Sequence, residues 1–201
     1  QELNRIVSQS IALKQDMATF SKSISQSDRD LLELMAPLID DAEFAVVLAM
    51  EASSEHDHTV HESNIYEHLT NLLHLKAKIS LMYSLFLEVD STKESFDVQP
   101  LKERFIAAHH HAKISIERLQ TNGYYQALSQ KFSCFSEYGL ADESIFSIHQ
   151  NILRTQEEAL NNITRSATLA TELSELVTQI TDEIETRVQG NTQSTGDRLD
   201  R

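Results

Sequence analysis

Apolar residues recur along the chain at steps of three and four, the spacing that places side chains on one face of a helix. In the first forty residues this seam has a period near 3.5 and consists of Leu3, Ile6, Leu13, Met17, Phe20, Ile24, Leu31, Leu34 and Leu38. Ser27 and Asp30 resemble a capping box, and Pro37 lacks a backbone donor, so we expect a kink or a restart between 25 and 37. The pattern predicts one long, bent helix that ends near residue 52.

Polar segments divide the middle of the chain into shorter helices. Residues 53–64 lack apolar periodicity and are expected to form a loop. A helix from about 65 to 89 follows, with an apolar stripe wide enough for a bundle interior. A third helix is expected from Leu101 to about Gln120 with Pro100 in its first turn, and a fourth from 125 to 138 with Gly139 as its left-handed cap.

The last helix has the clearest pattern, from about residue 144 to 188, and Asp142 or Ser144 can cap it. Its seam consists of Ile145, Ile148, Ile152, Ala159, Leu169, Leu173, Leu176 and Ile180. Such a helix is roughly 65 to 70 Å long at about 1.5 Å per residue, so the molecule should be elongated. Residues 189–201 contain two glycines and little apolar content, and we expect them to form a flexible tail.

Composition supports an all-α fold and excludes some partners. Only four glycines and two prolines interrupt the 201 residues, which favours long helices over a β architecture with many turns. The 31 acidic and 17 basic residues give a net charge of −14, which would repel nucleic acid and anionic lipid. No apolar run reaches the length of a membrane span, and the chain begins inside a helical pattern, so we expect a fragment of a longer protein.

The candidate chemical groups do not form a recognisable catalytic pattern. Cys134 lies between Phe132 and Phe135, and we expect it to be a buried core thiol. Consecutive helical side chains diverge by about 100°, so the triplet 109–111 of histidines cannot converge on one metal ion unaided. We therefore expect no enzymatic activity, no cofactor and no metal site.

A second group of histidines, at positions 56, 58 and 61, lies in the predicted loop. A solvated polar loop is the simplest interpretation, and metal binding and pH sensing are the alternatives that the sequence leaves open. Lys76, Asn162 and Ser166 interrupt apolar seams. Such polar positions can fix helix register, bind a ligand, extend to solvent or mark an incorrect helix phase.

Three segments of the chain resemble a known receptor family. They are NIYEHLTNLLHLKAKISLMYS, FSCFSEYGLADESIFSIHQNIL and LATELSELVTQITDEIETR, between Ile65 and Arg187. In these segments the chain resembles the sensor region of the TorS family of trimethylamine-N-oxide sensor histidine kinases, and more broadly the helical bimodular sensors of chemoreceptors. The chain departs from the family pattern by lacking the first transmembrane segment and the two helices that the family pattern places before Gln1.

The resemblance implies an elongated antiparallel helical bundle in which two stacked modules share the long first and last helices. The sensor region would comprise residues 1–188, with residues 1–30 and 160–188 near the membrane and residues 31–159 in the distal module. Residues 189–201 would lead toward a transmembrane segment. The first and last helices would be antiparallel neighbours with both termini at one end.

The function that follows is an extracytoplasmic sensor region in the periplasm, part of an inner-membrane receptor. Its input would be a ligand-loaded periplasmic binding protein of the TorT type, and its output a helix displacement within a homodimer. The alternatives are a chemoreceptor sensor that binds a small molecule directly and a structural helical scaffold. The input surface is expected at the membrane-distal tip, with five candidate contact residues, His58, His61, Tyr66, Tyr138 and Ser144.

Overall fold

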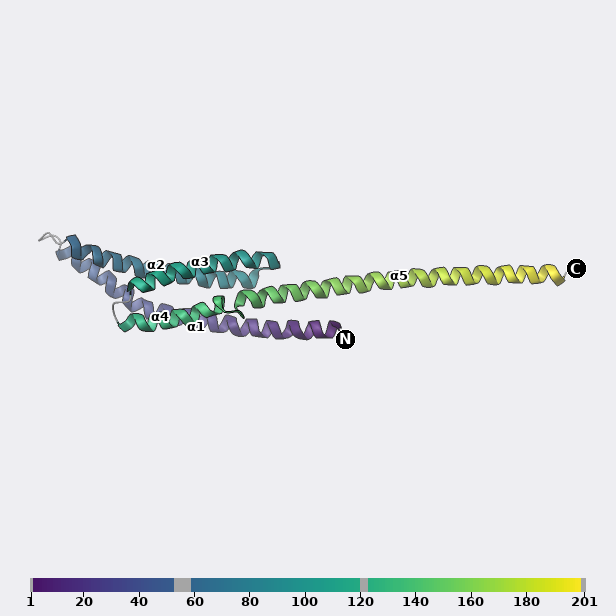
Figure 1. Ribbon diagram of the computed structural model, residues 1–201, viewed down its shortest axis with the longest axis horizontal. Helices are drawn as coiled ribbons and strands as arrows, with labels where there is room; N and C mark the ends of the chain where they lie inside the picture. Colours follow the sequence, from purple (N-terminus) through teal and green to yellow (C-terminus); the bar gives the residue numbers. More distant parts are fainter. Residues whose placement is uncertain (1, 53–58, 120–122, 200–201) are drawn as a thin grey trace.

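The computed structural model describes residues 2–52, 59–119 and 123–199, with side chains placed from 5 to 51, 63 to 119 and 125 to 188. Its five helices are α1 (Glu2–Ala52), α2 (Thr59–Ser91), α3 (Ser95–Leu119), α4 (Gly123–Leu140) and α5 (Ile145–Leu199). The described residues contain no strand. The prediction of an elongated all-α fold is therefore confirmed, and Figure 1 shows the arrangement.

The first helix is continuous and bent, as its seam predicted. α1 includes Pro37, which has no backbone N–H to donate and whose ring crowds the preceding turn. Figure 1 shows that the second half of α1 runs at an angle to the first half. A proline within an unbroken helix is a common cause of such a bend.

Several helix ends differ from the prediction. α2 begins at Thr59 and α3 at Ser95, so helix replaces the expected loop at 59–64 and the expected turn at 95–100. α5 continues to Leu199, so the expectation that helical structure stops near 188 was wrong. Extending an existing helix does not require the unfavourable nucleation step that starts a new helix. This advantage offsets the weak helix propensity of residues such as glycine.

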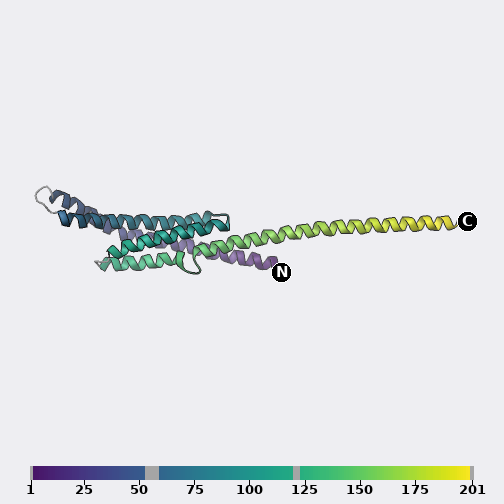
Figure 2. The ribbon, with the colours of Figure 1, turned by 45° about the horizontal axis from the view of Figure 1, so that its top comes forward.

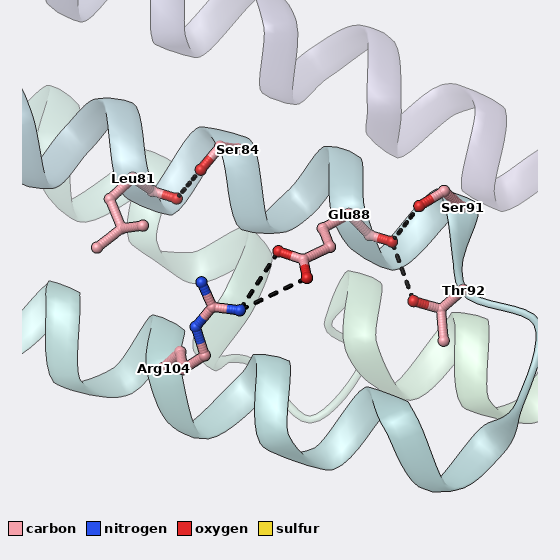
Figure 3. A network of polar contacts seen from close by, with 6 residues as sticks. All are labelled: Leu81, Ser84, Glu88, Ser91, Thr92 and Arg104. Atoms are coloured by element: carbon pink, nitrogen blue, oxygen red, sulfur yellow. Dashed lines mark hydrogen bonds and ion pairs between the residues drawn. The ribbon is translucent and has the colours of Figure 1, made fainter.

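The short connection between α2 and α3 is held by side-chain bonds at the end of α2, shown in Figure 3. The Ser91 and Thr92 hydroxyls both donate to the Glu88 carbonyl, at 2.8 and 3.0 Å. The Glu88 carboxylate also pairs with Arg104 of α3 at 3.4 Å. These contacts satisfy a terminal helix carbonyl and fix the position of the turn.

The helices form a four-cornered antiparallel bundle. α1 packs against α2, α2 against α3, and both α1 and α3 pack against the corner occupied first by α4 and then by α5. Figures 1 and 2 show that α4 and α5 run in the same direction, one after the other. The fourth corner is thus a helix interrupted between Leu140 and Ile145.

Four phenylalanines join the helices where α4 gives way to α5. Phe86 of α2 lies with its ring centroid 4.7 Å from that of Phe105, 5.5 Å from Phe135 and 5.9 Å from Phe146. All four rings are almost fully buried. Aromatic clusters of this kind bury much apolar area, so this junction contributes strongly to the hydrophobic core.

Gly139 belongs to α4 and does not adopt the left-handed conformation predicted for it. A Cβ atom at this position would overlap the Phe105 ring. Glycine is therefore required by close packing and not by backbone conformation. The helix ends one residue later, where the Ala141 N–H donates to the Glu137 carbonyl at 3.0 Å.

One further prediction about side-chain environment was wrong. Cys134 is exposed, although its neighbours Phe132 and Phe135 are buried. Its position lies about 100° from Phe135 around the helix, and that rotation carries it out of the core. Lys76 is exposed between the buried Leu75 and Ile79, so its side chain extends to solvent while the seam residues beside it fill the core.

The first and last helices are antiparallel neighbours, as predicted, but over only part of their lengths. α5 leaves the bundle and extends far beyond the start of α1, so Arg187 and the N-terminal end of α1 do not lie together. The prediction that both termini meet was wrong in this respect. Both helices nevertheless point out of the same end of the bundle (Figure 2). A second module around residues 1–30 and 160–188 stays a prediction.

Candidate functional site

The end of the molecule opposite the projecting part of α5 is a two-helix hairpin. α1 and α2 extend beyond α3 and α4 there, as Figures 1 and 2 show. The start of α4 marks the limit of the four-helix region, because the Tyr125 hydroxyl lies 2.7 Å from His68 Nε2 of α2. We call residues 42–52 of α1 and 59–67 of α2 the distal hairpin.

The distal hairpin exposes large apolar side chains. Phe44 is 64% exposed and Met50 is 61% exposed, and Val47, Leu48 and Tyr66 are also exposed. Two helices cannot cover every apolar side chain that four helices would enclose. Clustered apolar exposure of this kind is typical of a surface that contacts another macromolecule.

Of the predicted contact residues, only Tyr66 has its side chain described on the distal hairpin. His58 lies outside the described residues, and His61 lies in α2 without a described side chain. Tyr138 packs edge to face against Phe20 of α1, with ring centroids 5.8 Å apart. Ser144 is fully buried and lies 3.4 Å from the Ser147 backbone N–H, which it can weakly cap.

The expectation that Tyr66, Tyr138 and Ser144 lie together at one tip was wrong. α4 starts near the distal hairpin and runs away from it, so its C-terminal end reaches Phe20. Phe20 and Leu48 are separated by about 40 Å along α1 at 1.5 Å per residue. The structure therefore does not bring Tyr138 and Ser144 together with Tyr66.

Sequence periodicity missed the apolar residues of α1 beyond residue 42. Phe44, Val47, Leu48 and Met50 lie partly off the seam that fills the core through Ile39 and Ala42. The sequence feature that could have indicated them is the apolar face of this part of α1, which is too wide to be covered by one neighbouring helix. Their exposure depends on where α3 and α4 end, and one-dimensional spacing does not contain that information.

The consecutive histidines do not converge on one point. The His109 ring is stacked on Phe132, with centroids 5.4 Å apart and planes at 3°. Burial lowers the His109 pKa, and the charges of Lys113 and His110 lower it further. Within the described residues no group of three histidine, cysteine or acidic side chains could hold a metal ion.

Asp28 is the described side chain with an unsatisfied buried polar atom. It lies on α1 between the core positions Ile24 and Leu31. Its Oδ1 has no hydrogen-bond partner among the described residues, and burial raises the pKa of the carboxyl. A buried polar group without a partner costs stability, so this position weakens one layer of the bundle.

The projecting part of α5 carries a stripe of large apolar residues. Every described side chain from 163 to 188 is exposed. We call the stripe that consists of Leu169, Leu173, Leu176, Val177, Ile180 and Ile184 the α5 stripe, and each of its members is more than half exposed. At 100° per residue these positions span about 100° of the helix surface, the width of a face that packs in a bundle.

Comparison with known proteins gives no assignment: no protein-family model, curated protein or solved structure matches the chain. No helix in the described part of the chain is apolar over a stretch long enough to cross a bilayer.

Proposed function

We propose that the chain is the extracytoplasmic sensor region of a transmembrane receptor, of the type found in TorS-like histidine kinases. The distal hairpin receives a ligand-loaded periplasmic binding protein. The bundle converts this contact into a displacement of α5 relative to α1, and α5 carries the displacement toward the membrane. Two copies of the chain work together through the α5 stripe.

The observation that carries the proposal is the continuity of α5. Its first turns are packed in the bundle core, where Phe146 contacts Phe86 and Phe105. The same helix then projects out of the bundle to Leu199 without interruption. A packed helix moves as a rigid element between discrete arrangements, so a shift at the bundle would appear along its whole length.

The two exposed apolar surfaces support separate roles for the two ends. The distal hairpin combines Phe44, Met50 and Tyr66, the kind of aromatic and flexible side chains that are enriched in protein interfaces. The α5 stripe is longer and aliphatic, as expected of a helix-packing face. A structural scaffold would also use the α5 stripe, but it would need no second surface at the opposite end.

The proposal places Cys134 outside the cytoplasm, and its exposure makes that location measurable. In intact cells that express the full-length protein, a membrane-impermeant maleimide should modify Cys134 without permeabilisation. Peptide mapping after the reaction identifies the site, and Cys134→Ser is the matched control. Modification that occurs only after the cells are permeabilised would contradict the extracytoplasmic location.

A further inference from the structure

Three lysines that form no ion pair among the described residues surround a hollow where α5 enters the bundle. The hollow has a volume of about 780 Å³ and lies between α1, the connection after α2 and the first turns of α5. Lys14 and Lys22 of α1 and Lys93 of the connection line it. A volume in this range suits a small organic ligand.

The charge of this hollow differs in sign from that of the whole chain. The protein has a net charge of −14, yet three lysines and one acidic residue, Asp90, line the hollow. Among the described residues, the ion pairs involve Lys131, Arg104 and Arg187 and none of the three pocket lysines. Their ammonium groups are therefore available to an anion, and lysine binds carboxylate and phosphate groups as a point charge.

One wall of the hollow is fixed by a buried histidine. His149 of α5 is 6% exposed, and its Nε2 lies 2.9 Å from the Thr92 carbonyl oxygen. A carbonyl only accepts, so Nε2 carries the proton and donates it. This bond attaches the α2–α3 connection, which contains Lys93, to the first turns of α5. The hollow therefore keeps its shape without a ligand.

The floor of the hollow is apolar. Met17 and Leu153 are buried in the core and border the hollow, and Ile152 lies beside them. Apolar floor and cationic rim together match a short carbon skeleton that bears two or more negative charges. A neutral molecule of the same size would leave the lysines without partners.

We propose that this hollow binds a small organic dianion whose charges are carboxylate or phosphate groups. Lys14, Lys22 and Lys93 hold the charged groups, and the surface formed by Met17, Ile152 and Leu153 contacts the carbon skeleton. The bound molecule touches α1, the α2–α3 connection and α5 at once. Binding itself is independent of the sensor function proposed above, whereas any effect of the ligand on α5 depends on that function.

Isothermal titration calorimetry at low ionic strength tests the binding with two dianionic probes, succinate with two carboxylates and glycerol 3-phosphate with one phosphate, and with glycerol as the neutral probe. At least one anion should bind, and the more tightly bound probe indicates whether carboxylate or phosphate is preferred. Added salt should weaken the binding. Absence of binding by both anions at millimolar concentration, or equal binding of glycerol, would overturn the proposal.

Variants separate a shaped site from general charge attraction. The double substitution Lys14→Gln and Lys93→Gln should weaken anion binding at least tenfold, because charged hydrogen bonds are lost. The matched control, Lys76→Gln with Lys102→Gln, removes the same charge elsewhere and should change affinity less than twofold. Equal losses in both variants would show nonspecific attraction and overturn the proposal.

A third variant tests the hollow without changing charge. Ala18 is exposed on the wall of the hollow, so Ala18→Trp should fill it and abolish anion binding while helical content is kept. Ala107→Trp, at an exposed position of α3, is the control and should bind normally. Unchanged affinity in Ala18→Trp would place the anion elsewhere.

Discussion

Asp28 is the residue whose ionisation should most clearly oppose folding. Its Oδ1 is buried without a partner, and burial raises the pKa of the carboxyl above its value in the unfolded chain. Protonation therefore stabilises the fold. This contribution is complete below the unfolded pKa of about 3.9 and is lost as pH rises through the folded pKa.

Asp28→Asn should raise the free energy of unfolding at pH 7 by about 0.5–1 kcal/mol, a value reduced because the side chain is only partly buried. The gain should disappear below about pH 4, where the native carboxyl is also protonated. Urea denaturation at several pH values measures both effects. A variant less stable than the native protein at pH 7 would contradict this account.

Asp30 provides a control of opposite sign on the same helix. Its carboxylate accepts hydrogen bonds from Lys131 and Gln26, which lower its pKa. This contribution is present above the unfolded pKa and is lost as pH falls through the folded pKa. Asp30→Asn should therefore not gain stability at pH 7.

Gly139 tests the close packing between α4 and α3. Gly139→Ala should improve helix propensity by about 1 kcal/mol, but its methyl group would overlap the Phe105 ring. We expect a net loss of about 1–2 kcal/mol in thermal or urea denaturation, since overpacking outweighs propensity. The loss should be smaller when Gly139→Ala is combined with Phe105→Leu. A stabilising Gly139→Ala would show that the ring yields easily.

At the scale of the helices, apolar periodicity predicted five helices in the right order because it reports which face of each helix is buried. It did not predict the starts of α2 and α3 or the end of α5, where the helix includes polar residues that lie outside the apolar pattern. It also failed for Cys134, because two buried neighbours do not bury the residue between them. Residue environment there depends on the rotation of α4 about its axis.

The candidate site could be predicted only in part for a related reason. Tyr66 lies on the distal hairpin, as expected, because both the end of α1 and the start of α2 were recognised. Tyr138 and Ser144 were misplaced because the direction of α4 relative to the hairpin was misjudged. The exposed Phe44 and Met50 were missed because exposure depends on which helices end before them.

Pro37 should limit the stability of α1 and set its bend. Pro37→Ala restores one backbone donor and removes the clash with the preceding turn, so we expect the free energy of unfolding to rise by about 1–3 kcal/mol. Thermal denaturation measures the change. Asp40→Ala, an exposed position on the same helix, is the control and should change stability by less than about 0.5 kcal/mol. A destabilised Pro37→Ala would indicate that the bend is required for packing against α2 and α4.

At the scale of the whole molecule, the structure separates three regions along one axis. The distal hairpin exposes aromatic and apolar side chains, the bundle contains a single core, and α5 extends from that core as one helix. α4 and α5 together form the fourth corner of the bundle. The interruption at 141–144 separates α4, which begins near the distal hairpin, from α5, which leads out of the bundle. A shift of α5 can therefore occur without an equal shift of α4.

The proposed signalling role depends on the α5 stripe, because a displaced helix transmits a signal only if it contacts another element. Burial of a large aliphatic side chain contributes about 1.5–3 kcal/mol, so six exposed residues favour a covering partner. In the proposed receptor that partner is the α5 stripe of a second copy.

Disulfide crosslinking tests whether two copies of the chain pair through the α5 stripe. The experiment uses the full-length protein in its membrane, in a Cys134→Ser background. Leu173→Cys and Ile180→Cys lie on the stripe, whereas Glu175→Cys and Asp182→Cys lie on the opposite face of the same helix. The account predicts covalent dimers from the two stripe variants and little crosslinking from the other two. Equal crosslinking on both faces, or none at Leu173 and Ile180, would contradict it.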